Sequence, residues 1–350
     1  MNNSKVLKQL KTDIEKLAEN ITDIQFRENP NLEKKFGKTG RGRCLEDNRY
    51  HLNYLIEAVR IESTVLFNQY LEWVSVMLQQ RNIPDADLVS NIEYIGRVIS
   101  DQYPDSISKH VEKYLASGLN HLRSSKKHNQ SFIDDNQPFA DEARRYLSLL
   151  LDGKRAKAVS LIDDVYKNGA SVSEIYEYIF QATQYEVGAL WHRNEITVAH
   201  EHYCTAATQL IMSRFYPDIF STEKNGLKLV ACSVASELHE LGIRMVSDFF
   251  ELDGWDTYYM GANMPELHII DQLKAYQADL IAISVTLPIN VGRAETLIDE
   301  IRSDRELEGL KIITGGYAFL VVSDLWEKVG ADGFAKNARE AIHLAHNLVK

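Results

Sequence analysis

The 350-residue chain has few cysteines, no long apolar run and no excess of positive charge. Its three cysteines, Cys44, Cys204 and Cys232, are far apart and form no CxxC pair, which argues against a disulfide framework or a zinc knuckle. No apolar stretch is long enough to span a bilayer, and the N-terminus lacks the basic-then-apolar layout of a signal peptide. We therefore expect a cytoplasmic protein without a membrane segment.

The charge balance is acidic, with a formal net charge of −11. An acidic surface argues against broad electrostatic binding to nucleic acid. The densest basic run covers residues 34–43, contains several glycines and has acidic flanks. We interpret this run as a solvated loop.

The C-terminal part, residues 226–350, alternates apolar runs with amphipathic segments. Such alternation is typical of a doubly wound α/β fold, in which helices cover both faces of a parallel sheet. We expect a flavodoxin-like domain whose ligand lies beyond the carboxyl ends of five strands. The expected strands are 227–235, 257–261, 280–287, 310–314 and 333–335, and the expected helices are 239–252, 264–276, 291–304, 319–329 and 337–349.

The rest of the chain reads as helical, so the expected fold class is multidomain. Residues 138–220 predict a four-helix bundle because short connections make neighbouring helices antiparallel. Residues 1–130 predict an all-α domain without a basic helix-turn-helix. The polar segment 124–137 is the predicted linker. The expected helices are 5–24, 47–80, 86–102, 107–122, 139–151, 156–167, 171–191 and 197–215, with Pro217 closing the last one.

Three short motifs fall at the predicted carboxyl ends of strands. Glu237-Leu238-His239-Glu240-Leu241-Gly242 follows the first strand, Ser284-Val285-Thr286 comes after a gap of 41 residues, and Gly315-Gly316 after 28 more. Each motif alone is weak. Together, in this order and spacing, they resemble the cobalamin-binding module of methionine synthase, corrinoid methyl carriers and cobalamin light sensors. The resemblance implies that His239 replaces the cofactor's own base as lower ligand to cobalt.

The same resemblance implies roles for the neighbouring motif residues. Glu237 would fix the tautomer of His239, although the broad family usually has aspartate there. Gly242 would let the backbone approach the corrin edge, and Ser284 and Thr286 would hydrogen-bond the displaced nucleotide base. Gly315 and Gly316 would leave room for the nucleotide tail. Leu238 and Tyr317 complete the expected cofactor-binding set.

A second pattern lies in the predicted bundle, where Trp191 is followed after nine residues by Glu201-His202. It resembles the W-x9-EH motif of cobalamin-dependent photoreceptor regulators, in which these residues cover the upper face of adenosylcobalamin. The resemblance implies that His192 coordinates cobalt from above after light removes the adenosyl group. An aromatic cap over a planar cofactor is physically reasonable, and core packing of Trp191 is the alternative.

Three classes of function follow from these resemblances. The first is a light sensor, in which photolysis of the cobalt–carbon bond changes the domain arrangement or the homo-oligomer. The alternative is a corrinoid methyl carrier that works with partner methyltransferases. The third, a transcription regulator, would need a DNA-binding domain that residues 1–130 do not display. No catalytic barrel is evident, so we expect a binding or signalling protein rather than an enzyme.

The N-terminal third resembles, in its all-helical and aromatic-bearing character, the globin-like domain of photocobilins, which hold biliverdin beside cobalamin. A bilin needs basic groups for its propionates, polar groups near its pyrrole nitrogens and an aromatic wall. A helix cap, a surface histidine and core aromatics are equally consistent with the same residues, and Cys44 is either a thioether site or a packing residue. The candidate bilin-binding residues are Arg41, Arg43, Asp47, His51, Tyr54 and Trp73.

Overall fold

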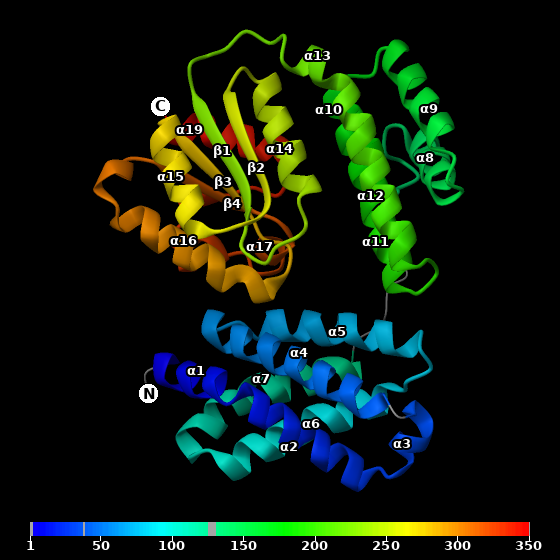
Figure 1. Cartoon of the computed structure of the whole chain (residues 1–350), viewed down its shortest axis with the longest axis vertical. Helices are drawn as coiled ribbons and strands as arrows, with labels where there is room; N and C mark the ends of the chain where they lie inside the picture. The colour runs from blue at the N-terminus through cyan, green and yellow to red at the C-terminus, as the bar shows by residue number, and fades with distance from the viewer. Residues whose placement is uncertain (1–2, 38, 125–130, 350) are drawn as a thin grey trace. The chain divides into compact units, whose positions relative to one another are not determined.

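The computed structural model describes residues 3–37, 39–124 and 131–349. The chain divides into two compact units, one of residues 1–127 with 321–325 and the other of residues 128–320 with 326–350 (Figure 1). None of the helices in the described residues combines the length and apolar character that crossing a bilayer requires.

The first unit is helical throughout its described part, but two predicted helices are each broken in two. The helix expected over 5–24 is interrupted at Asp13, and the helix expected over 47–80 turns at Glu62, whose φ is +59°. The left-handed conformation at Glu62 ends one helix and Ser63 begins the approach to the next. The helices are α1 (Asn3–Thr12), α2 (Ile14–Glu28), α3 (Asn31–Phe36), α4 (Gly40–Ile61), α5 (Thr64–Gln79), α6 (Asp85–Gln102) and α7 (Asp105–Ser124).

The basic run 34–43 was expected to be a solvated loop, and in its described residues this expectation is wrong. Helix α3 ends at Phe36 and α4 begins at Gly40, so both ends of the run are helical. Within that run, Arg41 forms an ion pair with Asp23 and lies 5.6 Å from the ring centroid of Phe26. Lys38 lies outside the described residues.

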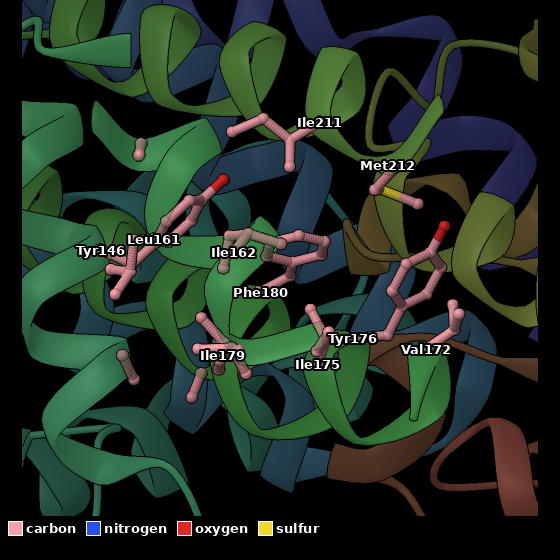
Figure 2. Packing of buried hydrophobic residues seen from close by; sticks show 14 of the residues in the cluster. Tyr146, Leu161, Ile162, Val172, Ile175, Tyr176, Ile179, Phe180, Ile211 and Met212 are labelled. Carbon is pink, nitrogen blue, oxygen red and sulfur yellow. The ribbon is translucent and has the colours of Figure 1, made fainter. Parts of the chain in front are cut away.

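The second unit begins with the predicted bundle. A large apolar cluster that includes Tyr146, Ile162 and Phe180 forms its core (Figure 2). Its elements are α8 (Ala140–Leu151), α9 (Arg155–Lys167), α10 (Val172–Glu174), the π-helix η1 (Ile175–Gln181), α11 (Ala182–His192), α12 (Val198–Met212), the 3-10 turn η2 (Ser213–Phe215) and α13 (Tyr216–Ile219).

Two expectations about the bundle are wrong. Pro217 does not close the last helix; it lies in the first turn of α13, where a missing N–H costs nothing because that group has no helical partner. Residues 131–137, expected to be linker, pack on the bundle, and Ile133 is only 5% exposed within its core. We call residues 131–137 the strap.

The sheet has five parallel strands in the order β2-β1-β3-β4-β5. Helices α14 and α19 pack together over one face, and α15 and α16 over the other (Figure 1). The doubly wound fold expected from the sequence is therefore confirmed. The strands are β1 (Lys228–Val234), β2 (Asp256–Met264), β3 (Leu280–Ser284), β4 (Lys311–Gly315) and β5 (Gly333–Phe334). The longer helices are α14 (Leu241–Leu252), α15 (Glu266–Tyr276), α16 (Val291–Ser303) and α19 (Ala338–Leu348), and two short ones, α17 (Tyr317–Val321) and α18 (Leu325–Lys328), replace the helix expected over 319–329.

The bundle and the sheet share a packed boundary inside the second unit. Met245 and Phe249 of α14 belong to the same apolar cluster as the bundle core. The Tyr176 hydroxyl donates a hydrogen bond of 2.9 Å to the buried Asp248 carboxylate, also on α14. This boundary brings α12 next to the loop that follows β1.

Candidate corrinoid site

The loop after β1 is held in a fixed shape at the carboxyl edge of the sheet. Ser236 has a φ of +67°, and its backbone N–H donates to the Asn263 side-chain oxygen at 2.8 Å. The Asn263 N–H in turn donates to the Glu237 carbonyl at 2.9 Å. Because Asn263 lies at the end of β2, the turn that carries Glu237 and His239 is tied to the neighbouring strand.

The Glu237 carboxylate is fully buried and joins the ends of β1 and β3. Its Oε2 accepts hydrogen bonds from the backbone N–H of Thr286 at 3.0 Å and Leu287 at 2.8 Å, and from Asn290 Nδ2 at 3.1 Å. Burial alone would raise the pKa of Glu237, but the hydrogen bonds from His239, the Leu287 amide and Asn290 hold it below its ordinary value. Glu237 is therefore an anion at neutral pH, with its charge directed by fixed donors.

The other oxygen of Glu237 orients His239. Glu237 Oε1 lies 2.5 Å from His239 Nδ1 and accepts the His239 backbone N–H at 3.2 Å. An anionic acceptor at Nδ1 requires the proton on that nitrogen, which leaves the Nε2 lone pair of the neutral ring as a metal donor. The side chain is 57% exposed, and the Ser233 hydroxyl bonds the His239 carbonyl at 2.9 Å. The hydrogen bond to Glu237 raises the pKa of His239 although burial opposes it.

The remaining motifs lie at the same edge. Ser284 ends β3 and pairs in register with Ser233 of β1 and Gly315 of β4. Thr286 contributes its backbone N–H to Glu237, a contact that the sequence did not predict. Tyr317, Leu238 and Gly242 are all exposed beside them.

Glycine is required at position 316 by the backbone conformation and by a close backbone contact, in addition to the room for a nucleotide tail that the sequence suggested. Its φ is +93°, and a Cβ added there would lie 2.4 Å from the Val285 carbonyl oxygen. The Ala318 N–H bonds that same carbonyl at 3.2 Å. Glycine thus lets the chain after β4 cross directly over the end of β3. At Gly315 an added Cβ would come only within 3.4 Å of the Ala335 carbonyl.

Trp191 and His192 end α11 in a well-defined turn. The Asn194 N–H bonds the Trp191 carbonyl and the Glu195 N–H bonds the Leu190 carbonyl, each at 2.9 Å, with Asn194 at a φ of +58°. This is a Schellman arrangement, which satisfies the last carbonyls of the helix. Trp191 is 37% exposed, a large exposure for an indole, so it is not a core residue in this structure.

Glu201 and His202 lie in the first turn of α12. His202 Nδ1 lies 2.5 Å from Glu201 Oε2, and the Thr205 hydroxyl donates to Glu201 Oε1 at 3.1 Å. The Glu201 charge contributes to the raised pKa of His239, so the two side chains lie within electrostatic range. Helix α12 is also joined directly to the loop that carries His239, because Gln209 of α12 hydrogen-bonds Glu240.

Three residues of this site were missed by the sequence interpretation. Asn290 and Asn263 hold the β1 loop, and Gln209 Nε2 donates to Glu240 Oε1 at 2.7 Å, joining α12 to that loop. Asn263 lies near the end of β2 and Asn290 directly precedes α16, positions at which asparagine gives a turn or cap signal. Their long-range partners have no local signature.

The candidate bilin residues are only partly brought together. His51 Nδ1 lies 2.8 Å from the Tyr70 hydroxyl, and Tyr54 stacks on Tyr70 with ring centroids 3.7 Å apart. Asp47 is exposed. Arg43 and Trp73 are also exposed, and Arg41 is engaged with Asp23. Cys44 is buried, which raises the pKa of its thiol to about 11 and favours the packing role.

The two regions that form the site match known families. Residues 142–216 and residues 227–343 each match a sequence family described as a B12 binding domain. Residues 142–216 and 227–343 therefore resemble the two parts of a B12-binding module. Cobalamin or a related corrinoid is therefore the supported ligand of the second unit.

Relatives and a solved structure agree with that module. The dimethylamine corrinoid protein 1 of Methanosarcina acetivorans is 26% identical over 182 residues, covering 51% of this chain and 83% of the relative. The dimethylamine corrinoid protein of Methanosarcina barkeri is 26% identical over 181 residues, with coverage of 51% and 83%. The structure of the Methanosarcina barkeri monomethylamine corrinoid protein aligns with a TM-score of 0.54 at 17% identity, covering 60% of this chain and all of that one, and shows the shared fold.

Proposed function

We propose that the second unit binds a cobalamin-type corrinoid with its own base displaced and His239 as lower cobalt ligand, and that the chain acts as a corrinoid methyl carrier for partner methyltransferases. One observation carries the ligand assignment. The Nδ1 atom of His239 is engaged by the buried Glu237 carboxylate, while the imidazole is exposed at the carboxyl edge of the sheet. A histidine held this way presents one donor nitrogen in a fixed direction.

The residues around His239 fit a corrin and its tail. Leu238 is 73% exposed, and Gly242 has open space where a Cβ would stand, so neither obstructs a flat ring at the start of α14. Trp191 supplies an exposed aromatic surface, and Glu201 and His202 supply polar groups from the bundle. Ser284 and Thr286 are suited to hydrogen-bond the displaced base.

The named relatives support the carrier role. They are dimethylamine corrinoid proteins, and the chain spans most of their length. A bound corrinoid supplies a cobalt centre that accepts and donates a methyl group. This chain would hold and orient that centre, and the methyltransferases would supply the catalytic groups, so the chain itself is not an enzyme under this proposal.

A second candidate, a light sensor binding adenosylcobalamin, rests on the upper-face residues. The Trp191, Glu201 and His202 spacing lies in the B12-binding module, and the Glu201 charge acts on His239. When adenosylcobalamin is the bound form, its weak cobalt–carbon bond makes the complex sensitive to visible light. His192 would then be the upper ligand after illumination, and biliverdin in the first unit would be a second chromophore.

One experiment tests binding and separates the two roles. The purified chain is loaded in the dark with methylcobalamin or adenosylcobalamin, and its absorption spectrum is recorded before and after green light. Methyl transfer in the dark from the methylcobalamin-loaded chain to the acceptor substrate of an added methyltransferase, with loss of the methyl group from cobalt, supports the carrier. A lasting shift of the adenosylcobalamin complex towards a bis-histidine spectrum supports the sensor. Failure to retain any corrinoid rejects both.

The bilin hypothesis has its own measurement. Biliverdin is added to the full chain, and unbound pigment is removed by gel filtration. A retained red-absorbing band supports a bilin in the first unit, and loss of all pigment on the column rejects it.

A further inference from the structure

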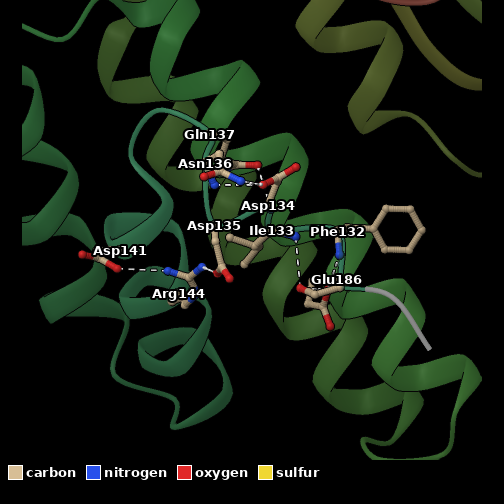
Figure 3. Close-up of polar contacts among 10 residues, drawn as sticks. Phe132, Ile133, Asp134, Asp135, Asn136, Gln137, Asp141, Arg144 and Glu186 are labelled. Atoms are coloured by element: carbon tan, nitrogen blue, oxygen red, sulfur yellow. Dashed lines mark hydrogen bonds and ion pairs between the residues drawn. The ribbon is translucent and has the colours of Figure 1, made fainter. Parts of the chain in front are cut away.

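The strap is attached to α11 by one buried carboxylate. Glu186, in the middle of α11, is 7% exposed, and its Oε2 accepts hydrogen bonds from the Ser131 hydroxyl at 2.9 Å and from the Phe132 backbone N–H at 2.7 Å (Figure 3). Ile133 fills part of the bundle core, and Gln137 Nε2 donates to the Tyr178 carbonyl at 2.7 Å. The strap is therefore an integral part of the bundle surface.

The second oxygen of Glu186 faces the site end of the same helix. Arg193 Nη2 lies 3.4 Å from Glu186 Oε1, and Arg193 Nε donates to Glu195 Oε1 at 2.6 Å. The Arg193 side chain is only 16% exposed because it folds back along the helix. Arg193 directly follows Trp191 and His192, and its backbone N–H begins the turn that leads to α12.

We propose that Glu186 is a positioning residue that couples the strap to the upper-face end of α11. The Glu186 carboxylate accepts hydrogen bonds from the strap through Oε2 and from Arg193 at the end of α11 through Oε1. Losing the bonds to the strap therefore changes how the carboxylate bonds Arg193, and losing Arg193 changes how it bonds the strap. Leaving a buried carboxylate without hydrogen-bond partners costs free energy, and this cost couples the strap to the end of α11. The strap is where the chain enters the second unit, so residues 1–124 have a covalent route to the upper face of the site.

The coupling is reciprocal by thermodynamic linkage. Loosening the strap must loosen the turn after Trp191, and ordering that turn must order the strap. Three backbone hydrogen bonds can be followed at the end of α11. The N–H groups of Arg193, Asn194 and Glu195 donate to the carbonyls of Ala189, Trp191 and Leu190, respectively. The Phe132 N–H, which donates to Glu186, can be followed in the strap.

The ligand-free test is amide hydrogen exchange on the full chain. In Ser131→Ala and in Glu186→Gln, we expect exchange to accelerate about tenfold at residues 131–133 and also at 193–195, where tenfold corresponds to about 1.4 kcal/mol. Asp163→Asn is the matched control. It removes a carboxylate charge that Arg214 bonds elsewhere in the bundle, and it should change neither segment. Faster exchange at 131–133 with unchanged rates at 193–195 overturns the coupling.

The ligand-bound test rests on the proposed corrinoid site. Adding hydroxocobalamin to the wild-type chain should slow exchange at 193–195 and at 131–133, and in Glu186→Gln only at 193–195. Protection of 193–195 without protection of 131–133 in the wild type also overturns the coupling. An absorption spectrum that shows no bound corrinoid rejects the proposed function instead, and the ligand-free test still decides the coupling.

Discussion

Glu237 and His239 form a directed pair in which the buried carboxylate holds Nδ1 of the exposed imidazole at 2.5 Å. The carboxylate is itself held by two backbone N–H groups and Asn290, all located about fifty residues further along the chain. The donor strength of His239 therefore depends on the hydrogen bonds that join the loop after β1 to the loop after β3. A hydrogen-bonded partner of this kind fixes both the tautomer and the direction of a metal ligand.

His239→Ala should bind corrinoid more weakly or leave its lower cobalt position without a protein ligand. The substitution removes the imidazole nitrogen that we propose as the lower cobalt ligand. Absorption spectra of the loaded protein measure the change. The exposed His268→Ala on α15 is the control, and equal spectra for both variants would contradict the assignment.

Cobalt ligation by His239 should be lost as the pH falls. The Nε2 lone pair is unavailable while that nitrogen carries a proton, and the hydrogen bond to Glu237 raises the pKa of His239 above its ordinary 6.5. Loss on acidification should therefore begin at a higher pH than for an ordinary histidine. In Glu237→Gln, which lacks the anionic partner, the midpoint of a spectral pH titration should move to lower pH. Identical midpoints in the two proteins would show that Glu237 does not control this proton.

Asn290→Ala should destabilise the second unit. The substitution removes a buried donor to the Glu237 carboxylate and the 3.3 Å bond to the Ser236 carbonyl. Loss of a hydrogen bond to a charged group costs about 1.5–3 kcal/mol. Denaturant unfolding followed by tryptophan fluorescence, to which the buried Trp255 of the second unit contributes, measures it. The exposed Asn347→Ala on α19 should leave the midpoint nearly unchanged.

Gly316→Ala should destabilise the second unit more than Gly309→Ala. Both glycines have nearly the same φ, +93° and +94°, so both variants carry the cost of a left-handed alanine, on the order of 1–3 kcal/mol. Only at position 316 would the new Cβ meet backbone, 2.4 Å from the Val285 oxygen, whereas position 309 has open space. Thermal unfolding of the two variants isolates the steric part, and equal melting temperatures would refute the close approach.

His192→Ala tests the light-sensor candidate. The variant should retain adenosylcobalamin in the dark, because His239 remains, but it should lack the second histidine needed for a bis-histidine spectrum after green light. The measurement is a difference spectrum before and after illumination. If the illuminated spectra of the variant and the wild type coincide, His192 has no role above the cobalt.

The sheet was accessible to sequence interpretation because its strands are buried on both faces. Leu229–Val234 and Leu280–Ser284 are continuous apolar runs, and a run of this kind indicates a central parallel strand. The break at Glu62 was not accessible, because the residues around it include no glycine or proline. The strap was misread for a different reason: it is mostly polar, and the burial of Ile133 in the bundle core has no local signal.

By itself the sequence determined that a helical bundle precedes a five-stranded parallel sheet and that His239 follows the first strand, because burial pattern and motif order are local properties. Only the tertiary structure decided which atoms hold that histidine, and that Glu201 on α12 acts on it. The donors to Glu237 and the link from Gln209 to Glu240 join residues 31 to 53 positions apart. Such contacts depend on strand register and on the packing of the bundle against α14, and no local pattern of residues encodes either.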